Sequence, residues 1–218
     1  MRTTVKMAVG SLVIGLLGVA QTRATNWVIG YPWGPTQNGS AYMQASQCQP
    51  NEGGYIFTAQ KSSEHSGYSY ISGTVYDSSG YTVNSSGHGV EAYISAPTET
   101  GAWPAFWLTT QGAWTGEMDV AEWKGNGNAT QNTYSANGTW QTTSHAANNT
   151  YFEVETYQKN STDATVYYYI NGSWTATHTG GGFMGKTFWI IFDLQTGGSS
   201  GTPTFTSCKM SFDGYGRW

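Results

Sequence analysis

The chain has 218 residues and a formal net charge of −4 at pH 7, with only 10% charged residues but 15% aromatic ones. An acidic chain with so little positive charge is a poor partner for nucleic acid or anionic membranes, which attract basic surfaces. No apolar pattern with a 3.6-residue period lasts beyond two turns, which excludes a helical bundle.

Residues 1–24 have the features of a secretory signal peptide. Arg2 and Lys6 precede an apolar run over residues 7–20, and the segment Thr22-Arg23-Ala24 follows, with small residues on either side of Arg23. The run is shorter than the roughly 20 residues that a membrane span needs. Cleavage removes the three cations Arg2, Lys6 and Arg23, which takes the charge from −4 to −7. We therefore expect a secreted, extracellular protein without a membrane partner.

Residues 25–218 carry short β-rich runs separated by Gly, Ser, Thr, Asn and Asp. This spacing is typical of an all-β sandwich. No linker or repeat divides the chain, so we predict a single domain over 25–218, present as a monomer. The runs are residues 55–59, 68–76, 90–94, 102–108, 117–121, 152–157, 165–170, 188–194 and 209–212.

The segment 101–126 concentrates acids in a chain that has few of them. Side chains of an extended strand alternate between faces, so Glu117 and Asp119 share one face and Glu122 falls on the other. One extra residue, a β-bulge near Val120 and Ala121, returns Glu122 to its partners. Two carboxyls that converge on one cleft are what glycoside hydrolysis requires.

The preceding run, 103–108, has the same two-residue period. Trp103, Ala105 and Trp107 share one face, and its indole rings can form the floor of a sugar site. Trp123 directly follows Glu122, points to the opposite face and is expected in the core. Trp33, Trp114 and Trp140 lie among turn residues, where loops can line the rim of a cleft.

These motifs resemble glycoside hydrolase family 16. The similarity rests on WPAFW at 103–107 and on GEMDVAEW at 116–123, followed by Gly125 and Asn126. It extends to YING at 169–172 and FWIIFDLQTGG at 188–198. The resemblance implies a concanavalin A-like jelly roll with curved antiparallel sheets and a concave cleft. It also implies retention of configuration, with Glu117 as nucleophile, Asp119 as its support and Glu122 as acid/base.

The two residues between Asp119 and Glu122 resemble the laminarinase type of the family. This implies an endo-acting enzyme for β-1,3- or mixed β-1,3/1,4-glucan, with sugar contacts from Trp103 and Trp107. A galactan of the agarase or galactanase type stays open as the substrate, as does a non-catalytic carbohydrate-binding sandwich. Tyr157 stands where the family usually has Trp, and no histidine follows the catalytic strand at 133–136, which leaves glycan specificity open.

Cys48 and Cys208 are the only cysteines, and an even pair in an exported chain predicts a disulfide between the first and last strands. The four histidines show no metal-ligand spacing, so no catalytic metal or cofactor is expected. Relatives in the family carry a structural calcium, but no Asp/Asn cluster here calls for one. Seven N-x-S/T sequons predict glycosylation on exposed loops, at Asn38, Asn84, Asn128, Asn137, Asn148, Asn160 and Asn171.

Overall fold

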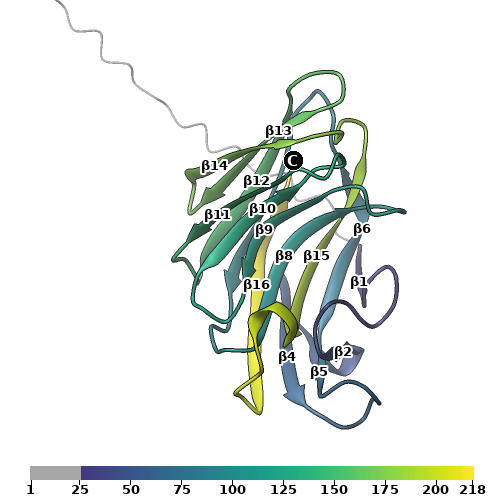
Figure 1. Ribbon diagram of the computed structural model, residues 1–218, viewed down its shortest axis with the longest axis vertical. Helices are drawn as coiled ribbons and strands as arrows, with labels where there is room; N and C mark the ends of the chain where they lie inside the picture. The colour runs from purple at the N-terminus through teal and green to yellow at the C-terminus, as the bar shows by residue number, and fades with distance from the viewer. Residues whose placement is uncertain (1–25) are drawn as a thin grey trace, which may run out of the picture.

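The computed structural model describes residues 26–218, which form two stacked β-sheets (Figure 1). The predicted signal peptide at 1–24 lies outside these residues. No helix between residues 26 and 218 is long and apolar enough to cross a membrane. The two helices of this part are single 3₁₀ turns, η1 (Ala45–Gln47) and η2 (Gly198–Ser200).

The first sheet has seven strands, all of them antiparallel to their neighbours. Figure 1 shows β6, β15, β8, β9 and β10 side by side in this order. The full order is β1 (Trp27–Ile29), β6 (Thr74–Thr82), β15 (Thr187–Thr196), β8 (Ala102–Thr110), β9 (Glu117–Trp123), β10 (Ala129–Tyr134) and β11 (Trp140–His145).

The second sheet has nine strands and lies behind the first. Its order is β14 (Ser173–Gly180), β13 (Ala164–Ile170), β12 (Thr150–Gln158), β7 (His88–Ser95), β16 (Ser207–Arg217), β4 (Gly54–Lys61), β5 (Tyr70–Ser72) and β2 (Ala41–Met43), with β3 (Cys48–Asn51) also paired to β4. The pair β2 and β5 is parallel, and all other pairs are antiparallel. The predicted all-β jelly-roll sandwich is confirmed.

The core lies between the sheets and is rich in aromatic rings. Phe192 of β15 stacks on Phe106 of the same sheet, with ring centroids 4.4 Å apart, and on Phe212 of the second sheet, with ring centroids 3.8 Å apart. These contacts join the two sheets. Burial of each such side chain contributes about 1.5–3 kcal/mol. Trp123 is fully buried and meets Phe152 edge to face. The predicted core position of Trp123 is confirmed. Because side chains alternate along a strand, its neighbour Glu122 points to the opposite face of the sheet, away from the core.

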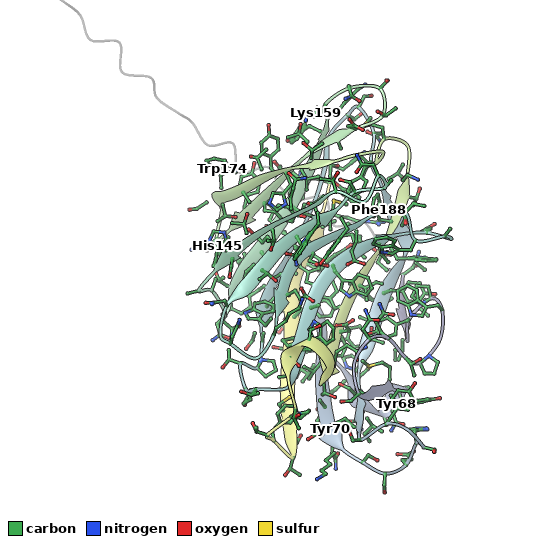
Figure 2. All side chains as sticks on the ribbon, in the orientation of Figure 1. Tyr68, Tyr70, His145, Lys159, Trp174 and Phe188 are labelled. Carbon is green, nitrogen blue, oxygen red and sulfur yellow. The ribbon has the colours of Figure 1, made fainter. Side chains whose placement is uncertain are left out.

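One edge of the sandwich is closed by side-chain hydrogen bonds between β11 and β14. The Gln141 amide donates to the Thr179 carbonyl at 2.9 Å and accepts from the Thr179 N–H at 3.2 Å. Figure 2 shows His145 of β11 and Trp174 of β14 at this edge. Tying the two edge strands together covers backbone groups that an open edge exposes.

The predicted disulfide is wrong, because Cys48 and Cys208 are free buried thiols. Cys48 of β3 lies opposite Phe57 of β4, whereas Cys208 of β16 lies opposite Ala59 on the other side of β4. The intervening strand holds their backbones about 9.5 Å or more apart. A disulfide needs Cα atoms within about 7 Å. Chain order alone did not reveal that β4 inserts between these two strands.

A buried ion pair ties β6 to the end of β16, and its loss should destabilise the fold. The Arg217 guanidinium lies 3.2 Å from the Asp77 carboxylate, which also accepts a hydrogen bond from the Tyr215 hydroxyl. Asp77→Ala leaves the guanidinium buried and unpaired, which costs about 3–5 kcal/mol. We expect the Tm to fall by about 10 °C in thermal unfolding. Asp213→Ala is the matched control on β16, and an equal Tm for both variants would contradict the assignment.

Candidate active site

A β-bulge brings the three acids of β9 to one face, as the sequence predicts. Asp119 lies opposite Trp107 of β8 and Ala121 lies opposite Phe106, so Val120 is the additional residue. On the other side, Asp119 pairs with Asn132 and Glu122 with Thr130. Glu117, Asp119 and Glu122 consequently line a single cavity of about 70 Å³.

Donor groups from β8, from β10 and from the residue after β9 surround the Glu122 carboxyl. The Trp103 indole N–H donates to Oε1 at 2.7 Å, and the Asn132 amide donates to Oε2 at 3.1 Å. The Lys124 ammonium lies 3.1 Å from the same Oε2 and 5.6 Å from the Trp103 ring centroid, where it makes a cation–π contact. Glu122 is only 8% exposed, so these contacts fix its orientation towards the cavity.

Asn132 also links Glu122 to Asp119. Its amide nitrogen donates to Asp119 Oδ2 at 2.8 Å, while Thr142 of β11 donates to its carbonyl oxygen and so fixes which way the amide points. Glu117 takes a hydrogen bond from the Trp114 indole at 3.1 Å. Sequence reasoning missed Asn132, because it lies in a polar run of Thr, Gln and Asn that gives no strand signal.

Crowding of acids in a buried site shifts their protonation. Burial raises the pKa of Glu117 to about 7; the hydrogen bond from Trp114 opposes this rise, and the charge of Glu122 adds to it. Burial, followed by the charges of Glu117 and Glu122, raises the pKa of Asp119 well above its ordinary value. The sequence predicts a raised carboxyl pKa from like-charge repulsion; the rise is present, but burial is its larger cause and repulsion between the acids adds to it. The group therefore favours holding a proton near neutral pH.

A larger cavity of about 620 Å³ continues from the acids along the outer face of the seven-stranded sheet. Gln37, Asn38, Trp107 and Glu117 line both cavities, so the two form one cleft. The larger cavity has an aromatic lining, made by Trp33, Trp107, Trp114, Tyr134 and Trp189. Aromatic walls of this kind suit the apolar faces of sugar rings.

Four of the five tryptophans predicted for substrate binding line this cleft: Trp33, Trp103, Trp107 and Trp114. Trp140 does not line either cavity. It lies on the edge strand β11, 60% exposed, and stacks on Tyr134 with ring centroids 5.7 Å apart. Sequence reasoning missed Tyr134 and Trp189. Trp189, Ile191 and Asp193 alternate along one face of β15, and this alternation is a signal that could have identified Trp189.

A fourth carboxyl, that of Asp193 on β15, also lines the smaller cavity. The Tyr31 hydroxyl donates to its Oδ2 at 2.6 Å and the Trp107 indole donates to the same oxygen at 3.1 Å. Burial raises the pKa of Asp193 to about 7; the two hydrogen bonds oppose this, and the charges of Glu122 and Glu117 add to it. Lys124 is the one Lys or Arg paired with any of these four acids in the described part of the chain.

These raised pKa values predict how stability depends on pH. A carboxyl whose pKa is higher in the folded state keeps a proton that the unfolded chain has already released, so unfolding becomes easier as the pH rises from about 4 to 7. Each extra proton costs about 1.4 kcal/mol per pH unit over this range. We expect the Tm to be higher at pH 5 than at pH 8, and Asp193→Asn to reduce that difference. An unchanged pH dependence of the Tm in this variant would contradict the assignment.

Acids gathered beneath an aromatic cleft supply both chemical groups that cleavage of a glycosidic bond needs, which defines the class of the protein as a glycoside hydrolase. Residues 37–188 match the family described as Glycosyl hydrolases family 16. The chain belongs to this family. Among residues 26–218 no three His, Cys, Asp or Glu side chains are grouped so as to hold a metal ion.

The relatives include enzymes that act on galactan and on β-glycan. The chain is 31% identical over 198 residues to a galactan endo-β-1,3-galactanase of Flammulina velutipes, covering 83% of this chain and 79% of that protein. It is 29% identical over 165 residues to the endo-1,3-1,4-β-glycanase ExsH of Rhizobium meliloti, covering 70% of this chain but 35% of the relative. The fold is similar to the laminarinase catalytic domain of Thermotoga maritima, with a TM-score of 0.69, 18% identity and coverage of 88% and 90%.

Proposed function

We propose that the protein is an endo-acting, retaining hydrolase of a β-1,3-linked polysaccharide. The observation that carries this proposal is the bulge at Val120, which turns Glu117 and Glu122 into one cavity. The cleft continues past the acids on the aromatic side, which suits binding in the middle of a chain. In this proposal Glu117 is the nucleophile, Glu122 the acid/base and Asp119 the group that supports Glu117.

In the first step, a carboxylate oxygen of Glu117 attacks the anomeric carbon. The bond between that carbon and the glycosidic oxygen breaks, and the oxygen takes a proton from Glu122. The Trp103 indole and the Asn132 amide hold Glu122 in place for this transfer. The step yields a glycosyl ester on Glu117 with inverted configuration at the anomeric carbon.

In the second step, water attacks the same carbon and gives its proton to Glu122. The ester bond breaks, Glu117 leaves as a carboxylate, and the second inversion restores the original configuration. The ester on Glu117 carries no charge, so it does not repel a negative charge elsewhere in the cavity. Lys124, 3.1 Å from Glu122, supports the negative charge that Glu122 carries in this step.

For the sugar, we favour β-1,3-galactan. The galactanase of Flammulina velutipes is matched over 79% of its length, whereas the β-glycanase ExsH is matched over 35%. The sequence motifs placed β-1,3-glucan first, and it remains the second candidate because of the two β-glycanases among the relatives. Four acids in the smaller cavity disfavour a sulfated galactan.

The test is a panel of β-1,3-galactan, laminarin, lichenan and agarose, with release of reducing ends as the signal. We expect cleavage of β-1,3-galactan to oligosaccharides, with the β-anomer formed first in NMR spectra. Release from laminarin alone would move the assignment to the glucan. Binding of these polymers without release from any of them would leave the alternative, a non-catalytic carbohydrate-binding sandwich.

Export is a further part of the proposal. It rests on the signal-like residues 1–24. Amino-terminal sequencing of the secreted protein should begin just after Ala20 or Ala24, and size-exclusion chromatography should show a monomer. Retention of an uncleaved amino terminus inside the cell would refute export.

A further inference from the structure

One oxygen of the Asp193 carboxyl has no hydrogen-bond partner although it is buried. Asp193 is 2% exposed, and both of its donors, Tyr31 and Trp107, bind Oδ2, whereas Oδ1 makes no hydrogen bond. A buried carboxylate oxygen without a partner costs free energy. Because Asp193 lines the smaller cavity, a donor from the substrate can supply what the protein does not.

The sheet register places Asp193 and Glu122 on either side of a small residue. Asp193 of β15 lies opposite Ala105 of β8, and Ala105 lies opposite Glu122 of β9. Two strand spacings separate the acids by about 9.5 Å at their backbones. Ala105 projects only a methyl group into this gap and lines the cavity with both acids. The space over Ala105 is therefore open to a sugar ring next to the acid/base.

We propose that Asp193 is a specificity-determining residue whose free Oδ1 accepts a hydrogen bond from an unsubstituted hydroxyl group of the sugar over Ala105. This inference rests on the proposed function and narrows its substrate class. The sugar at this position is neutral and carries no substituent on that hydroxyl.

The chemistry of the acceptor explains the selection. An ionised carboxylate can only accept hydrogen bonds, and a hydroxyl can donate one. A methyl ether, an anhydro bridge or a sulfate ester has no hydrogen to donate and leaves Oδ1 unpaired. A sulfate also brings negative charge to a cavity lined by Glu117, Asp119, Glu122 and Asp193.

A chain of hydrogen bonds holds the Asp193 carboxyl in this orientation. The Gln195 amide donates to the Tyr31 hydroxyl, which in turn donates to Asp193 Oδ2. The rival interpretation is that Asp193 only holds the Trp107 indole in place through Oδ2. The two interpretations differ in whether Oδ1 contributes to sugar binding.

Calorimetric binding in the Glu117→Gln background separates these interpretations without depending on cleavage. The probes are β-1,3-linked galacto- and gluco-tetraosaccharides, and mono-deoxy analogues of whichever binds more tightly, one for each free hydroxyl of the ring. We expect Asp193→Ala to weaken binding about 10- to 100-fold. One deoxy analogue should bind the protein that retains Asp193 with a similar loss of affinity. The same analogue should lose no further affinity when Asp193 is replaced by Ala. If the losses of affinity from the variant and from the analogue are additive for every analogue, the proposal is overturned. Asp193 then only holds the Trp107 indole in place.

Asp193→Asn gives a second test that keeps the size of the side chain. Its amide oxygen can still accept from Tyr31 and Trp107, while its NH₂ group turns the free acceptor into a donor. At pH 8, above the pKa of about 7, the wild-type carboxyl is ionised. We expect the preference for the free hydroxyl over its O-methyl ether to fall at least about tenfold in this variant. Asp213→Asn is the control, and an unchanged preference would overturn the proposal.

The two proposals fail in different ways. If no polysaccharide of the panel is cleaved, the hydrolase assignment fails, and the binding measurements still decide the role of Asp193. If the wild type cleaves its substrate but neither Asp193 variant changes selectivity, the hydrolase assignment stands and the role in specificity is lost.

Discussion

Replacement of Glu117 by glutamine is expected to lower kcat on the preferred polysaccharide by at least about 10,000-fold. The amide has almost the same size and can keep the hydrogen bond to the Trp114 indole, but it cannot attack the anomeric carbon. Substrate binding should persist, because the aromatic cleft is unchanged. Reducing-end release measures the loss, and Glu64→Gln on an exposed loop is the matched control. Substantial residual turnover by pure Glu117→Gln protein would refute the role of nucleophile.

The stereochemistry of chemical rescue identifies Glu117 more sharply than the loss of rate. Glu117→Gly leaves space for an azide ion, which can attack an activated aryl β-glycoside from the vacated side. Only one displacement then takes place, so the product is an azide of inverted configuration. A product with retained configuration would show that another group still forms the covalent intermediate.

Replacement of Glu122 by glutamine is expected to lower kcat/KM on polysaccharide by about 100- to 10,000-fold. The loss should be much smaller on an aryl glycoside whose leaving group departs without a proton, because Glu122 acts as the acid in the first step only for poor leaving groups. Trp103 and Asn132 donate to different oxygens of Glu122, so the single amide oxygen keeps one of these two hydrogen bonds. The amide has nearly the same size as the carboxyl, so the site should stay folded. Steady-state kinetics on both substrates measure the difference.

The configuration of the azide product distinguishes loss of Glu122 from loss of Glu117. With Glu122→Ala, the ion should attack the glycosyl ester on Glu117, and the product should keep the configuration of the substrate. Equal losses on both classes of substrate and no azide product would contradict an acid/base role for Glu122. The contrast between retained and inverted products assigns the two glutamates independently.

The central part of the site could be predicted from the sequence because it is local. Glu117, Asp119 and Glu122 lie on one strand, where alternation together with a single bulge decides which face each residue occupies. Trp103 and Trp107 follow from the same alternation on the neighbouring strand. Family resemblance added the roles of these residues, and the structure places all five side chains on one cavity.

The rest of the site depends on pairings between distant segments. Asp193 reaches the cavity because β15 pairs with β8, about 90 residues earlier in the chain, and Tyr31 comes from the loop after β1. Alternation along β15 shows which face Asp193 occupies, but no local pattern places that face beside Glu122 or brings Tyr31 to it. Asn132 lies on β10, whose Thr, Asn and Gln residues have no apolar alternation, so packing against β9 determines its conformation. The incorrect disulfide has the same origin, since only the strand order shows that β4 separates the cysteines.

Because Val120 is an inserted residue, the number of residues between Glu117 and Glu122 does not by itself decide whether the two acids share a face. What decides it is whether that number is odd or even once the bulge is taken into account. A strand lacking that residue would keep its two end acids on the same face through plain alternation, with one position fewer between them. Natural variants or engineered deletions at this point should therefore conserve the pair of acids when the irregularity and the residue disappear together. A deletion between Glu117 and Glu122 that leaves the β-bulge in place would put these two acids on opposite faces of the sheet, so that one of them points into the apolar interior.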